Sequence, residues 1–417
     1  MIYYLKKILL LLILVASLYP NQQFSLKGFN IENSCNEVSI NNLKGIIGVM
    51  VEFELEEPDD LRTSGDGKFI TINPDEDEFY PSFINYDDLS RCSKTLLDPP
   101  PHNLPYFESQ LKAVINYYRN ISDNQIFPDI ASYQMAEQVY LANESMEYYA
   151  RSENKLTELY VETVIKSADA IVDISEQRGW DDDEFIVVVF HAGLGQDLGS
   201  PGFDPTIYDI HSAYIDSNML SECSSLSDNS VCSSIQGSSL TIQNNAGESR
   251  LISEGILLPE TLNPIYYDVV EDMYNNSLVE ENELEDIYCY YQTGMTGLFA
   301  YLLGYRLCMP PMHGTDNIYP ITRIGRFGLM DYGAYNRHGL IPSPPNPWTR
   351  IKHQQISPNQ VINKTEDMFS NFPDTVNFKI NPGLETVYRI DITDNEYFLI
   401  EHRSNLIRNN SILDGLG

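Results

Sequence analysis

The histidines of this chain are the first candidates for catalysis or metal binding. There are seven, and no two of them lie three or four residues apart: His102, His191, His211, His313, His338, His353 and His402. A zinc-binding helix usually carries two histidines one turn apart in the pattern HExxH, with a glutamate that polarises the attacking water. That pattern is absent, so no helix of this chain can present a histidine pair on one face.

Tyrosines, rather than histidines, have one-turn spacing in the segment YLLGYRLCMPP, residues 301–311. Tyr301 and Tyr305 would share one face of a helix, and Leu302 follows the first of them. A phenol with a pKa of about 10 is a poor zinc ligand at neutral pH. A leucine cannot act as a general base. The two tyrosine rings are therefore expected to fill an interior cavity by packing.

Other catalytic schemes find no support in the sequence. The pattern GxSxG is absent, and no glycine-rich phosphate loop precedes a helix. The acidic run WDDDEF, residues 180–185, comes directly before an apolar segment and is expected to form a solvated turn. Clustered carboxylates nevertheless leave calcium binding open, without a site that the sequence identifies.

The cysteines and the N-terminus indicate an exported protein. Residues 1–18 have two lysines, then a short apolar run and small residues, which is typical of a signal peptide, with an uncleaved anchor as the alternative. We therefore expect a secreted or cell-envelope location. Disulfides are permitted there, and Cys223 with Cys232 is the favoured local pair among six: Cys35, Cys92, Cys223, Cys232, Cys289 and Cys308.

The charge of the chain limits its partners. The formal net charge is −34, which repels nucleic acid and anionic membrane surfaces. After removal of the signal peptide, we expect a peptide or protein as the partner, with an undetermined oligomeric state.

The helices and strands expected around these residues indicate an α+β protein. Hydrophobic patterns predict strands at 45–55 and 185–190, and helices at 106–122 and 156–178, the second ending at Gly179. Within that second helix, the predicted core positions are Val161, Val164, Ile165, Ala168, Ile171 and Val172.

The second half of the chain has three further features. Residues 216–240 are serine-rich and predict a surface insertion. The acidic run at 280–286 is expected to open the region of the 301–311 helix, as the helix dipole prefers. From about residue 376, alternating runs such as VYRIDIT and EYFLIEH predict antiparallel strands.

Five segments, in this order, resemble landmarks of the immune inhibitor A family of secreted bacterial metallopeptidases: RTSGDGKF, PYFESQLKAVINYY, HAGLGQD, RIGRFGLMDYGAYN and EYFLIEHR. The resemblance covers roughly residues 45–405. It implies a zincin-like metallopeptidase domain with a mixed β-sheet and packed helices, followed by a β-rich C-terminal region. The implied boundaries are 40–350 for the peptidase domain and 351–417 for the C-terminal segment. A further family strand would follow that segment, so the chain is expected to be truncated.

The zinc helix of that family reads like HEFGHxLGLPDLY, and YLLGYRLCMPPMH lines up against it. The glycine, leucine and proline of the pattern coincide with Gly304, Leu307 and Pro310. Tyr301 and Tyr305 stand where the histidines belong, Leu302 replaces the glutamate, and Pro311 replaces the aspartate. Met330 would correspond to the methionine turn beneath a zinc site, and we expect it to pack under Tyr301 or Tyr305.

The resemblance therefore implies a peptidase scaffold without zinc catalysis, with no cofactor, that binds peptide or protein or serves as a surface protein. Two alternatives stay open. The first is an active zinc metalloendopeptidase with non-standard ligands, for which His191, His313 and Asp316 are the candidates. The second is a purely structural protein. Aromatic side chains that block the groove would favour this alternative, whereas an open groove would favour peptide binding.

Overall fold

The computed structural model describes residues 42–58, 60–71, 97–198, 206–225, 231–264, 292–312, 322–353, 356–364, 384, 386–393 and 396–403. Several predictions fall outside this part of the chain. They concern the signal peptide, the acidic run at 280–286, and the residues Cys35, Cys92, Cys289, His313 and Asp316.

The centre of the fold is a five-stranded mixed sheet with the order β2-β1-β3-β8-β4. All neighbouring strands are parallel except β4, which runs antiparallel to β8 at one edge. The strands are β1 (Gly45–Glu52), β2 (Tyr133–Leu141), β3 (Phe185–Leu194), β4 (Ala213–Ile215) and β8 (Gly255–Thr261). Every residue of the central strand β3 is buried, as its continuous apolar run predicts for a strand covered on both faces.

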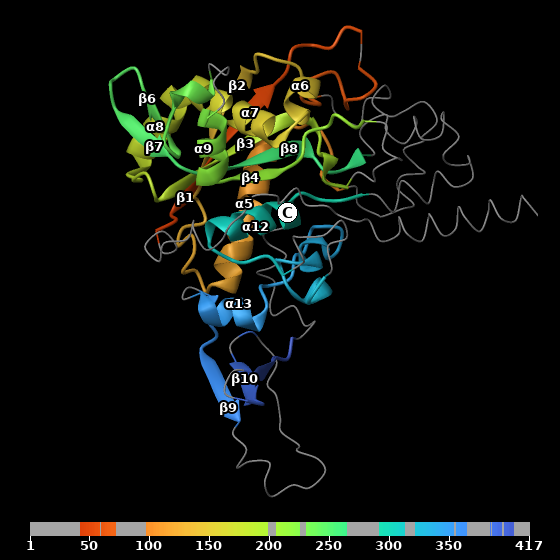
Figure 1. The fold of residues 1–417 in the computed structure, drawn as a ribbon, viewed down its shortest axis with the longest axis vertical. Helices are drawn as coiled ribbons and strands as arrows, with labels where there is room; N and C mark the ends of the chain where they lie inside the picture. The colour runs from red at the N-terminus through yellow and green to blue at the C-terminus, as the bar shows by residue number, and fades with distance from the viewer. Residues whose placement is uncertain are drawn as a thin grey trace, which may run out of the picture.

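Two helices cover one face of this sheet. Helix α5 (Leu104–Ile121) begins at the predicted place, with Asn103 as its N-cap and a proline in its first turn. Helix α12 (Thr296–Arg306) is the YLLGYR helix. Phe107 of α5 and Phe299 of α12 both pack on the ring of Phe190 in β3, so the two helices share one face (Figure 1).

The opposite face carries α6 (Met146–Ala150), α7 (Glu153–Lys166) and α8 (Ala168–Arg178) (Figure 1). The single helix predicted for 156–178 is therefore two helices, and that prediction was wrong. The break is at Ser167, whose hydroxyl and backbone N–H both donate to the carbonyl of Thr163 one turn earlier, a back-bond of the kind that often bends helices. Ile165, a predicted core residue, lies beside the break and is exposed, whereas Val161, Val164, Ile171 and Val172 are buried. Gly179 ends α8 in the left-handed region, as predicted.

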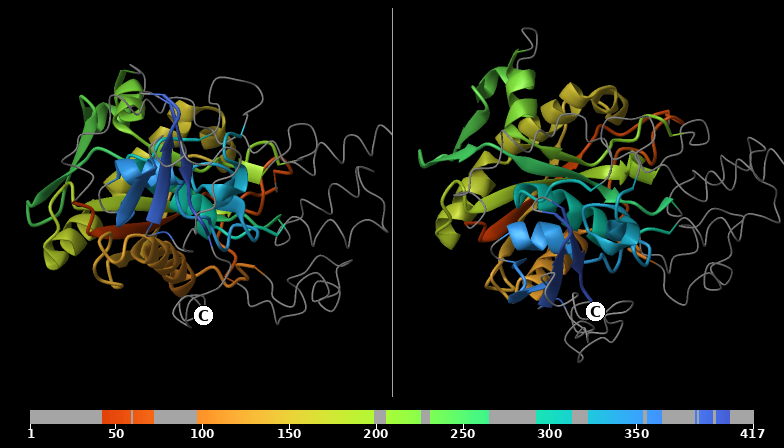
Figure 2. Two further views of the ribbon diagram at one scale, coloured as in Figure 1. Left: turned by 90° about the horizontal axis from the view of Figure 1, so that it is seen from below. Right: turned by 60° about the horizontal axis from the view of Figure 1, so that its bottom comes forward.

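The serine-rich segment is more than a surface insertion. It forms α9 (Ser217–Ser225), a short 3-10 helix (Cys232–Ser234) and strands β5 (Ile235–Gln236) and β6 (Ser239–Gln243), and β7 (Ser249–Ile252) completes a second sheet at one edge of the molecule (Figures 1 and 2). Two of its own residues, Leu220 and Leu240, are fully buried. The predicted disulfide Cys223–Cys232 is present, and both of its cysteines are buried.

The C-terminal region is β-rich, as predicted, and lies beyond α12 from the main sheet (Figures 1 and 2). Helix α13 (Pro347–Lys352) leads to a sheet of β9 (Gln360–Lys364), β10 (Thr386–Asp391) and β11 (Tyr397–Ile400). β10 and β11 are antiparallel, as predicted, while β9 is an additional strand parallel to β10. Among the described residues, no helix is long and apolar enough to cross a membrane.

Candidate functional site on helix α12

Helix α12 is buried along its whole length, from Thr296 to Arg306. It has no acidic residue in its first turn, and the acidic run at 280–286 lies outside the described residues. A residue that is distant in sequence places a carboxylate at this end of the helix. The Asp98 carboxylate accepts a hydrogen bond of 2.9 Å from the backbone N–H of Met295, directly before the helix. A carboxylate at this end complements the helix dipole.

Tyr301 and Tyr305 lie on one face of α12 and contact each other. Their hydroxyl groups are hydrogen-bonded at 2.5 Å, and their rings meet edge to face with centroids 5.2 Å apart. The exposed fractions are 0% and 1%, so both rings are interior side chains. The ring of Tyr214, from the edge strand β4, lies 5.8 Å from that of Tyr305. The prediction that the two rings pack in the interior is confirmed.

The chemistry of these donors does not fit zinc. Burial raises the pKa of Tyr301 well above its ordinary value of 10.0, and it also raises the pKa of Tyr305. Both phenols are therefore neutral at physiological pH, whereas a metal needs the deprotonated oxygen. Leu302, between them in sequence, is buried and has no proton-accepting atom. The three residues supply neither a zinc ligand nor a general base.

Met330 lies beneath the same helix. A methyl group at Gly304 would come within 2.6 Å of the Met330 sulfur, so the thioether packs at Gly304, between the two tyrosines in sequence. We expected Met330 to pack under Tyr301 or Tyr305, whereas the contact that the structure shows is with Gly304. The backbone carbonyl of Met330 also accepts a bond from Met312, which follows the helix. These two contacts hold the turn against α12.

Asp331, the residue after Met330, fixes the shape of this turn. Its Oδ2 atom accepts hydrogen bonds from the backbone N–H groups of residues 323–325 at 2.9–3.0 Å, and from the hydroxyl of Thr322 at 2.9 Å. Its Oδ1 atom accepts the N–H of Tyr332 at 2.8 Å. A buried carboxylate that accepts five donors is a structural element of the loop.

His191, the first candidate for a rebuilt zinc site, lies on the wrong face of the sheet. Phe190 faces α12, and successive side chains of a strand point to opposite faces, so His191 points away from that helix. Its ring lies 6.3 Å from that of Phe53. Its Nδ1 atom bonds the carbonyl of Ala192 at 2.8 Å, while Nε2 is buried without a partner. Burial lowers the pKa of His191 to about 4, so the ring is neutral.

The remaining candidates, His313 and Asp316, lie outside the described residues. Within the part of the chain that the structure describes, no three histidine, cysteine, aspartate or glutamate side chains are grouped to bind a metal. The residues WDDDEF form a turn before β3, and its aspartates are exposed, as predicted for a solvated turn.

Two polar features near α12 are absent from the sequence-based prediction. The first is a buried pair formed by His102 Nδ1 and Glu260 Oε1 at 2.6 Å, in which the glutamate also accepts the N–H of Ile70 at 2.7 Å and that of Gly193 at 3.1 Å. This pair joins the ends of β3 and β8 to the segment before α5. The sequence holds one sign of this pair: Glu260 is a carboxylate within the apolar run GILLPET, where a charged side chain needs a buried partner.

The second is Arg306, the last residue of α12, which is 2% exposed. Its Nε atom lies 2.6 Å from Glu254 Oε1, and its Nη2 donates to the carbonyl of Asp183 at 2.7 Å. The hydroxyl of Tyr214 donates to the same glutamate. These bonds connect α12 to the edge strand β4, to the segment before β8 and to the acidic turn before β3.

No protein-family profile, no curated protein and no solved structure matches this chain.

Proposed function

We propose that this chain is an immune inhibitor A-like peptidase-domain protein that has lost zinc catalysis and acts as a peptide- or protein-binding or surface protein. The observation that carries this proposal is the buried pair Tyr301–Tyr305. Two neutral phenols bonded to each other occupy the helix positions that two zinc ligands would need. Leu302 occupies the position of the catalytic glutamate, so water activation has no base.

The arrangement around α12 supports the zincin-like part of the proposal. Among the strands that the structure describes in the main sheet, β4 alone is antiparallel to its neighbour; it lies at the edge and contacts α12 through Tyr214 and Tyr305. A methionine turn lies beneath the same helix at Gly304. An exposed sheet edge beside the helix is where an extended peptide could pair as an additional strand.

The burial of the tyrosines also bears on how a partner would bind. An open groove would leave the rings of Tyr301 and Tyr305 accessible to a peptide, but both are buried. The edge strand β4 is only 3 residues long. These observations favour a structural or surface protein over capture of a peptide at α12.

The alternative of an active metallopeptidase with non-standard ligands gains nothing from His191, which points away from α12. A cleavage assay separates the two functions. The chain without residues 1–18 is incubated with unfolded casein and a fluorogenic peptide mixture, with added zinc and with a chelator. We expect no cleavage in either condition. Cleavage that the chelator abolishes, and that survives Tyr301→Phe, would establish the alternative.

A further inference from the structure

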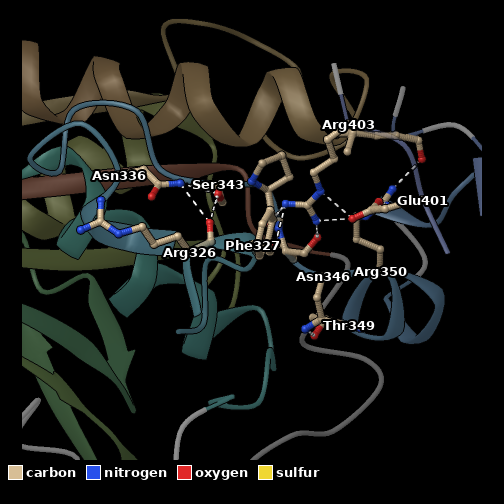
Figure 3. A network of polar contacts seen from close by, with 12 residues as sticks. Arg326, Phe327, Asn336, Ser343, Asn346, Thr349, Arg350, Glu401 and Arg403 are labelled. Carbon is tan, nitrogen blue, oxygen red and sulfur yellow. Dashed lines mark hydrogen bonds and ion pairs between the residues drawn. The ribbon is translucent and has the colours of Figure 1, made fainter. Parts of the chain in front are cut away.

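A network of buried and half-buried charges joins the C-terminal strand to the rest of the protein (Figure 3). The Glu401 carboxylate, directly after β11, lies between two guanidinium groups. One is that of Arg350 on α13, which is 1% exposed and also donates to the carbonyl of Leu384 at 2.6 Å. The other is that of Arg403, whose Nε and Nη2 atoms are both 2.5 Å from Glu401 Oε1.

Arg403 connects this network to a loop far away in sequence. Its guanidinium donates to the carbonyls of Phe327 at 2.6 Å, Pro345 at 3.2 Å and Pro344 at 3.4 Å. The loop, residues 322–346, is closed on itself. The carbonyl of Arg326 accepts both the hydroxyl of Ser343 at 2.6 Å and the side-chain amide of Asn336 at 3.0 Å (Figure 3).

The same loop is bonded to α12 at both ends of the helix. Near its N-terminus, the N–H groups of Gly294 and Gly297 donate to the carbonyls of His338 and Gly339, each at 2.7 Å. Towards its C-terminus, Met330 packs on Gly304. A continuous path of contacts therefore leads from Glu401 through Arg403 and the loop to the helix that carries Tyr301 and Tyr305.

We infer that Arg350, Glu401 and Arg403 form a latch by which the C-terminal sheet holds the 322–346 loop against α12, so that opening the latch loosens this loop while the main sheet stays folded. The reason is that the carboxylate of Glu401 pairs with both guanidinium groups. Without its charge, two guanidinium groups face each other, and Arg350 remains buried without a counter-charge. The least costly response is for β10, β11 and Arg403 to move into water together. The loop then loses the donors that bind three of its carbonyls.

Hydrogen exchange of the whole chain with the variant Glu401→Gln tests the latch. We expect the amides of β10, β11 and residues 325–345 to exchange at least about tenfold faster than in the unchanged protein, with β1 and β3 unaltered. The matched control is Asp391→Asn, which removes a carboxylate from the same sheet. Asp391 pairs with Arg389, and both side chains are exposed by more than a third (36% and 41%). The control should leave every segment unchanged.

Two results would overturn the latch. Faster exchange in β10 and β11 alone would show that the sheet does not hold the loop, and equal acceleration in β3 would show that Glu401 supports the whole fold. If Glu401→Gln fails to fold, Arg403→Gln gives the answer, because it removes the donors to Phe327, Pro344 and Pro345 and keeps the Arg350–Glu401 pair. The loop alone should then exchange faster, and an unchanged loop would contradict the inference.

Discussion

The hydroxyl groups of Tyr301 and Tyr305 are bonded to each other one turn apart on α12, where both rings are buried. This contact satisfies the polar atom of each ring within the interior and leaves the remainder of both rings to pack. The contribution of this contact to the stability of the fold can be measured.

The first prediction concerns this bond. Tyr301→Phe or Tyr305→Phe removes one hydroxyl and leaves the other without that partner, which costs about 1–3 kcal/mol of unfolding free energy. The double variant should cost less than the sum of the two, because both single changes remove the same bond. Urea unfolding measures all three. Tyr117→Phe, which removes a separate bond to the carbonyl of Ser343 at 2.8 Å, should be additive with Tyr301→Phe. Strict additivity of Tyr301→Phe with Tyr305→Phe would contradict the pairing.

The second prediction compares two glycines of α12. A methyl group at Gly297 would lie 1.9 Å from the backbone oxygen of Ala334, which cannot move without shifting the loop. At Gly304 it would meet the flexible end of Met330 at 2.6 Å. Alanine also favours a helix by about 1 kcal/mol over glycine. Gly297→Ala should therefore destabilise strongly, by about 3 kcal/mol or more, and Gly304→Ala by clearly less. Thermal unfolding measures the stability of both variants. A larger loss for Gly304→Ala than for Gly297→Ala would contradict the packing of the loop on α12.

The third prediction concerns the loss of stability at acidic pH. The pKa of His191 is lowered by burial from 6.5 to about 4, so between these values the unfolded chain binds a proton that the folded protein rejects. The stability contribution is complete above pH 6.5 and is lost as the pH falls towards 4, and it amounts to about 3 kcal/mol. In His191→Gln this dependence should vanish, and in His402→Gln, where the histidine is exposed, it should persist. Urea midpoints between pH 7 and pH 4 measure it, and parallel curves for the unchanged protein and His191→Gln would contradict the burial.

The fourth prediction concerns Asp98, whose contribution to stability changes with pH in the opposite direction. Burial raises the pKa of Asp98 above 3.8, although the bonds from Met295 and Gln110 act the other way. The folded protein thus holds a proton that the unfolded chain has lost, and this contribution disappears as the pH rises through the folded pKa. Asp98→Asn does not titrate and should gain stability relative to the unchanged protein as the pH rises from 4 to 7. The exposed Asp391→Asn should show no such trend. A variant that loses stability relative to the unchanged protein as the pH rises from 4 to 7 would contradict the prediction.

Much of the central layer could be predicted from the sequence because its signals are local. The apolar run of β3 has the length and composition of a strand that is buried on both faces. Gly179 ends α8 because its φ of 65° suits glycine. The one-turn spacing of Tyr301 and Tyr305 predicts their contact without any knowledge of the fold.

The errors and omissions arose where a contact between distant residues, or a single side chain, determines the local structure. The helical pattern breaks at Ser167, whose hydroxyl donates back to Thr163, although the hydrophobic periodicity continues on either side. The carboxylate of Asp98 at the start of α12 is 197 positions from Met295. Strand β9 is parallel to β10, and a parallel partner leaves no hairpin signal. The pairing of His102 with Glu260 likewise depends on the folded chain.

The most direct test of the central claim is the zinc content of the purified chain without residues 1–18, measured by elemental mass spectrometry after dialysis. A non-catalytic α12 site predicts zinc far below one equivalent, both as purified and after incubation with excess zinc. The same amount should be found in Tyr301→Phe. One tightly held equivalent per chain, retained after dialysis and lost in His313→Ala or in Asp316→Ala, would contradict it and identify a rebuilt metal site.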